Sequence, residues 1–149
     1  MIESRTSAPL ALLLLTGLLA GCALPSLKDR SQSVAFVQAQ TADTRLGSAV
    51  GREIETHPDL SGITTLEHPL VAFVARALLA EASERSLDVQ YYIWRDDITG
   101  KLLLYSLYRA AERGVRVRLL LDDNGIAGLD DLLAALNHHD NVEVRLFNP

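Results

Sequence analysis

The spacing of hydrophobic and polar positions changes several times between residues 69 and 147. Three stretches carry apolar residues at helical intervals, and each is followed by a short run with strand-like character. Pro69 suits the first turn of a helix and Gly114 the end of one. An alternation of helices and strands implies parallel strands joined by right-handed crossovers. We expect helices near 69–84, 103–111 and 129–136, and strands near 87–94, 115–121 and 142–147.

Three parallel strands form an incomplete sheet. Such sheets are normally covered on both faces, whereas this order of elements leaves two edges exposed and ends at Pro149. The predicted fold class is therefore α/β: the start of an αβα sandwich with parallel strands, incomplete within this chain.

The first residues are typical of a lipoprotein signal peptide. An apolar run at 10–21 is shorter than the roughly 20 residues of a spanning helix and is typical of a secretory signal. It ends in the tetrad Leu-Ala-Gly-Cys at 19–22, which matches the bacterial lipobox. The sequence predicts a signal peptide over 1–21 and lipidation of Cys22, which makes the membrane a partner.

Residues 22–66 are expected to form a tether and lead-in, because they are rich in Ser, Thr, Gln, Gly and Pro and keep no sustained period. Several acyl chains on Cys22 would anchor the chain stably, at ~0.8 kcal/mol per buried methylene. Ala23 follows the cysteine where an aspartate would favour retention at the inner membrane. We expect a location in the bacterial envelope, at the outer membrane facing the periplasm.

The composition narrows the possible functions of the chain further. The chain has 149 residues, enough for one modest domain, and a net charge of −5, which argues against a broad nucleic-acid surface. A single cysteine excludes an intramolecular disulfide and a Cys-rich zinc site. We expect no nucleic-acid partner, no metal and no other cofactor.

Asp122 and Asp123 carry the most suggestive chemistry, because they follow a strand where α/β proteins bind ligands. A haloacid-dehalogenase-like phosphatase needs Asp-x-Asp, but Asn124 occupies the third position. A response-regulator receiver needs another order of elements, and a dinucleotide site needs an upstream glycine-rich loop. A solvated turn or a helix-capping acid pair stays open as the alternative.

Other candidates have plainer interpretations. Asp96 and Asp97 fit a turn with side-chain hydrogen bonds. Trp94, together with Tyr91 and Tyr92, could form an aromatic wall for a lipid or a base, although aromatic residues in strands usually belong to the core.

The histidines and arginines are weaker candidates. His57 and Ser61 lie in a turn-like cluster without a partner acid, and His138 and His139 point apart at a helix end. The arginines at 116 and 118 lie at the wrong end of their strand to meet a phosphate at the expected site.

Three blocks, 87–97, 113–123 and 144–149, closely resemble the phospholipase D superfamily, and within it the bacterial cardiolipin synthase C type. The resemblance covers roughly residues 57–149. It implies that 67–149 is the N-terminal part of the first of two phospholipase D-like lobes.

The resemblance also implies a mechanism. Each lobe contributes a His-x-Lys-x-x-x-x-Asp motif; one histidine attacks phosphorus to form a phosphohistidine, the other acts as acid and base, and the lysines stabilise the developing charge. None of the four histidines of this chain begins such a motif. We therefore assign no catalytic residue and keep Trp94, Asp122 and Asp123 as substrate-cleft candidates.

The expected function is that of the N-terminal portion of a phosphatidyltransferase acting on phospholipids, inactive by itself. A phospholipase or nuclease of the same superfamily, or a non-catalytic envelope lipoprotein used as a binding module, remains the alternative.

Overall fold

The computed structural model describes residues 32–149, and Ala35–Pro149 form one compact unit. The order of helices and strands predicted from residue 69 onward is confirmed. The helices are α2 (Arg45–Thr56), α3 (Pro69–Ala82), α4 (Ile98–Glu112) and α5 (Asp130–Asn137), with two short 3-10 helices, η2 (Gln38–Gln40) and η3 (Asp123–Gly125). The strands are β1 (Ser86–Tyr91), β2 (Arg116–Asp122) and β3 (Val142–Phe147).

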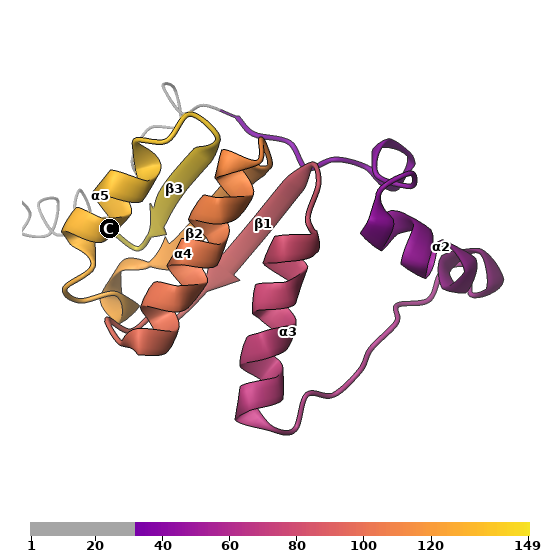
Figure 1. Cartoon of the computed structure of the whole chain (residues 1–149), viewed down its shortest axis with the longest axis horizontal. Coiled ribbons are helices and arrows are strands. Elements are labelled where there is room, and N and C mark those ends of the chain that lie inside the picture. The colour runs from indigo at the N-terminus through magenta and orange to yellow at the C-terminus, as the bar shows by residue number, and fades with distance from the viewer. Residues whose placement is uncertain (1–31) are drawn as a thin grey trace, which may run out of the picture. The chain divides into compact units, whose positions relative to one another are not determined.

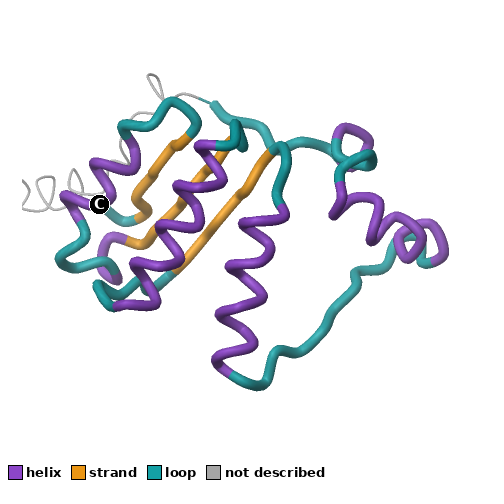
Figure 2. Tube along the Cα trace, viewed as in Figure 1, coloured by secondary structure: helices purple, strands orange, loops and turns teal. Residues whose placement is uncertain are grey.

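The three strands form one parallel sheet in the order β1-β2-β3. Helices α3, α4 and α5 lie along the same face of this sheet (Figure 1; Figure 2). The predicted fold class is confirmed: the chain is a mixed α/β protein with three parallel strands, consistent with an incomplete αβα fold.

The core lies between the sheet and these helices. On β2, Val117, Leu119 and Leu121 are at most 1% exposed and face the helices. The alternate residues of the strands form the other face, where Arg118 of β2 pairs with Asp88 of β1. One face of the sheet is therefore apolar and the other carries charge, as the two-residue period of a strand dictates.

Helix α2 lies in the segment that the sequence pattern assigned to a tether and lead-in. The Thr44 hydroxyl accepts the N–H of Gly47 at 3.0 Å and caps the helix. Leu46, Val50 and Ile54 recur every four residues, but glycine and serine lie between them and weaken the pattern. The division of the chain at residues 21 and 66 stays a prediction.

Two arginines tie neighbouring segments together. Arg85 bonds the Gln40 carbonyl and the Asp43 carboxylate, which fixes the segment before α2 to the start of β1. Arg113 donates to the carbonyls of Ala80 at 2.9 Å and Glu81 at 3.0 Å, and so satisfies the C-terminal end of α3.

The predicted signal peptide and Cys22 lie outside the described residues. Within residues 32–149, no helix combines the length and the apolar character needed to cross a membrane.

Candidate functional site

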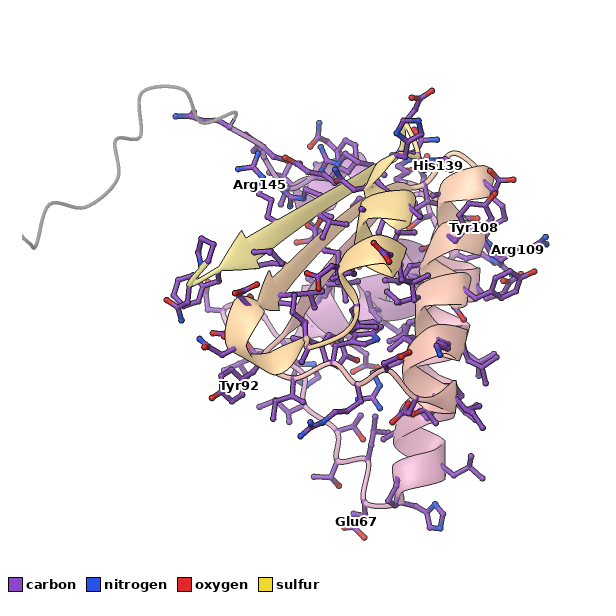
Figure 3. The ribbon with its side chains drawn as sticks, turned by 90° about the vertical axis from the view of Figure 1, so that its left-hand side faces the viewer. Glu67, Tyr92, Tyr108, Arg109, His139 and Arg145 are labelled. Carbon is purple, nitrogen blue, oxygen red and sulfur yellow. The ribbon has the colours of Figure 1, made fainter. Side chains whose placement is uncertain are left out.

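The carboxyl ends of the three strands border a cavity of about 310 Å³. This edge is where parallel α/β sheets commonly bind ligands. Figure 3 shows Tyr92 at this end of the strands and His139 at the opposite end. The lining consists of Gln90, Tyr91, Tyr92, Leu120, Leu121, Asp122 and Phe147.

Asp122 is the buried carboxylate of this edge, 7% exposed. One carboxylate oxygen accepts the backbone N–H of Asn124 at 3.0 Å, and the other accepts the side-chain amide of Asn148 at 3.1 Å. Asn148 itself has a φ of 55°, which is unusual for a residue other than glycine. Asp122 thus links the loop after β2 to the chain that leaves β3.

Asp123 does not share the environment of Asp122. It begins η3 and is exposed, whereas its neighbour lines the cavity. The structure therefore places one of the two predicted carboxylates at the cavity and turns the other toward solvent.

Trp94 is 4% exposed and belongs to the core. Its ring meets the Tyr91 ring edge to face at 4.7 Å, and its indole N–H donates to the Gly100 carbonyl at 3.2 Å. It borders a second, smaller cavity of about 170 Å³ rather than the one at Asp122. The structure thus does not bring Trp94 together with Asp122, and a role in a substrate cleft stays a prediction.

The loops after β1 and β2 are joined through a glycine. The backbone N–H of Trp94 donates to the Gly125 carbonyl at 3.0 Å. A Cβ on Gly125 would lie 2.1 Å from the Tyr92 carbonyl oxygen, so only glycine fits there. This close approach fixes the rim of the cavity.

Asp96 and Asp97 form the turn that the sequence predicted. Asp97 accepts the backbone N–H of Gly100 and the hydroxyl of Thr99, both at 2.7 Å, and caps α4. These hydrogen bonds, the one from Gly100 first, hold the pKa of Asp97 below its usual value. Asp96 pairs with Lys101 at 2.8 Å. Both carboxylates thus serve the start of α4.

His139 connects α4 to the start of β3. Its Nε2 lies 3.0 Å from a Glu112 carboxylate oxygen, its Nδ1 accepts the N–H of Asn141 at 3.1 Å, and its ring meets that of Tyr108 (Figure 3). His138 is exposed at the end of α5. Among residues 32–149, no three His, Cys, Asp or Glu side chains gather to hold a metal ion.

His57 lies in an exposed turn, with its Nδ1 3.1 Å from the Thr56 hydroxyl and from the Glu53 carbonyl. Ser61 is exposed nearby in sequence. The interpretation of this segment as a surface turn is confirmed.

The arginines at 116 and 118 lie on the charged face of the sheet. Arg118 makes two bonds to Asp88, at 2.7 and 2.6 Å, and this fork lowers the pKa of the Asp88 carboxyl and raises that of Arg118. Arg116 stacks over the Phe36 ring at 4.5 Å. Both guanidinium groups therefore have structural partners away from the cavity.

Four residues of the cavity edge were missed or only touched on by sequence reasoning: Gln90, Tyr92, Phe147 and Asn148. Their common signal is position, because each lies at or just beyond the carboxyl end of a strand. Together with Asp122 they offer a carboxylate, two amides, a phenol and an apolar ring. Such groups can bind and orient a hydroxyl.

No family model matches the chain. Cardiolipin synthase C of Escherichia coli (strain K12) is 58% identical over 105 residues, which cover 70% of this chain and 22% of that protein. An uncharacterized protein of Helicobacter pylori (strain ATCC 700392 / 26695) is 38% identical over 106 residues, 71% of this chain and 21% of that protein. The chain thus spans about a fifth of the length of these relatives. The resemblance to cardiolipin synthase C found in the three sequence blocks is confirmed.

Among solved structures, TrmBL2, an archaeal chromatin protein, aligns with a TM-score of 0.43 at 15% identity over 95% of this chain and 49% of that chain. So loose a likeness carries no argument.

Proposed function

We propose that this chain, a relative of cardiolipin synthase C and so of the phospholipase D superfamily, is the N-terminal part of a phosphatidyltransferase that acts on phospholipids. The observation that carries the proposal is the 58% identity over 105 residues to a curated enzyme of phospholipid metabolism. The order of helices and strands in the structure supports it, since it agrees with an incomplete αβα fold.

In this proposal the described residues form part of a scaffold and one wall of a cleft. The two His-x-Lys-x-x-x-x-Asp motifs would come from later segments of a longer polypeptide, one histidine forming the phosphohistidine and the other moving protons. Asp122 would hold the chain that leaves β3 in place through Asn148. The charged face of the sheet, lined by Asp88 and Arg118, would be covered by the same later segments.

The membrane enters the proposal through Cys22. Diacylglycerol on its thiol and an acyl chain on its amino group would anchor the protein at the outer membrane, on the periplasmic side, close to its lipid substrates. We propose no nucleic-acid partner, because the chain carries a net charge of −5.

The test is to read the gene beyond codon 149 and to assay the protein it encodes. With phosphatidylglycerol micelles, a full-length protein bearing two His-x-Lys-x-x-x-x-Asp motifs should form cardiolipin, whereas the 149-residue chain should form none. Without the nucleophile, the acid and the second lobe, the barrier should be higher and the rate should fall by many orders of magnitude.

The products separate the alternatives. Phosphatidic acid without cardiolipin would indicate a phospholipase, and cleavage of DNA without lipid turnover a nuclease. A stop codon directly after codon 149, with an inactive but membrane-bound chain, would favour the binding module. Turnover by the 149-residue chain that Asp122→Asn abolishes would refute our placement of the chemistry.

A further inference from the structure

Helix α2 presents an apolar row that stays half-exposed in the part of the chain that the structure describes. Leu46, Val50 and Ile54 lie four residues apart, and therefore on one side of the helix, and are 36%, 49% and 41% exposed. No residue of α2 is buried. An amphipathic helix with this face half-exposed lacks part of the contact that normally stabilises it.

We propose that this row of Leu46, Val50 and Ile54 lies on the surface of the lipid bilayer. The inference rests on the proposed lipid anchor at Cys22. Arg45 follows Cys22 by 23 positions, so even a fully extended chain keeps α2 within about 80 Å of the anchored residue. At this distance the tether holds the helix at a high effective concentration near the bilayer, and a short apolar row suffices for contact.

The charges of α2 indicate what kind of lipid contact to expect. Arg45 and Arg52 are balanced by Glu53 and Glu55, so the helix is neutral. Attraction then comes from apolar burial under the tether and should depend little on anionic lipid or on salt.

A second copy of the chain is a poorer occupant. A stable protein interface buries about 800 Å² on each partner, which three half-exposed side chains on a helix of 12 residues do not provide.

Contact at α2 would orient the rest of the described unit. The backbone N–H of Arg45 donates to the Glu84 carboxylate at 2.7 Å, and Arg85 binds Asp43. These bonds fix the N-terminal end of α2 to the start of β1. A bilayer that holds the row thereby also holds this corner of the sheet near its surface.

The experiment places a fluorescent label on each side of α2. Cys22 is the sole cysteine, and lipidation blocks its thiol, so Val50→Cys and Glu55→Cys each create one labelling site in the lipidated chain. Glu55 is the matched control, because it lies on the same helix away from the row. Each protein is reconstituted in phosphatidylethanolamine–phosphatidylglycerol vesicles that contain nitroxide-labelled lipid.

We expect strong quenching at position 50 and little at position 55, unchanged when neutral phosphatidylcholine replaces phosphatidylglycerol. Protein that floats with the vesicles but shows equal quenching at the two positions overturns this inference and leaves the anchor standing. A label at position 50 that is shielded from water yet not quenched by the nitroxide means that protein covers the row, and also overturns it. Protein that does not float refutes the anchor, and the inference with it.

Discussion

Replacing Asp122 by alanine tests whether the carboxyl edge of the sheet is held together as described. The change removes a buried carboxylate that accepts hydrogen bonds from Asn124 at 3.0 Å and from Asn148 at 3.1 Å. Hydrogen bonds to a charged group contribute about 1.5–3 kcal/mol each, and less here because both donors belong to exposed residues that water can satisfy. At ~1 kcal/mol for each bond, the free energy of unfolding should fall by about 2 kcal/mol.

Urea denaturation followed by circular dichroism measures this loss. With an m-value of about 1.5 kcal/mol/M, a loss of about 2 kcal/mol lowers the midpoint by about 1.3 M. Asp123→Ala is the matched control, since it removes the same group from the exposed neighbour and should change stability by no more than about 0.5 kcal/mol. Equal losses in the two variants would refute the distinction between a linking and a solvated carboxylate.

Three further predictions address the core, the charged face and the anchor. Leu119→Ala, at a residue 1% exposed, should cost about 2–5 kcal/mol in urea unfolding, and Leu120→Ala less than half as much; the opposite ranking would contradict the one-sided core. Asp88→Asn should lower the free energy of unfolding at neutral pH, because the two bonds from Arg118 depress the pKa of the folded carboxyl. The difference in stability between the variant and the native chain should vanish as the pH falls below the usual value of 3.8 and through the depressed pKa. A difference that persists in strong acid would refute the pairing of Asp88 with Arg118. Mass spectrometry of the membrane-extracted protein should find an acylated N-terminal Cys22, and a mature chain that begins earlier would rule this out.

The regular part of the fold could be predicted from the sequence because its periods are local. Val117, Leu119 and Leu121 alternate with Arg116 and Arg118, and this alternation alone assigns the two faces of β2. The end of β1 could not be predicted from the sequence pattern. The aromatic run continues to residue 94, but pairing with β2 stops at 91, and Trp94 then turns into the core.

The sequence could predict that Asp122 lies at the carboxyl edge of the sheet, where it lines the cavity, but it could not predict the hydrogen bonds that Asp122 accepts. The position of Asp122 at the end of a strand indicated a ligand-binding edge. The bond from Asn148 to Asp122 depends on the register between β2 and β3, which joins residues 26 positions apart. Helix α2 escaped prediction because its apolar row has only three members, and the pattern carries no information about what covers them.

The strand order β1-β2-β3 follows the order of the chain, and this has a consequence for biosynthesis. Each new strand pairs with the strand made just before it, and its crossover helix has already been synthesised. The sheet can therefore grow by one helix–strand pair at a time as the exported polypeptide emerges, without waiting for a distant partner. Trp94 would settle in the core only after Gly125 has emerged, so the first and second loops of the cavity rim become fixed in the same step.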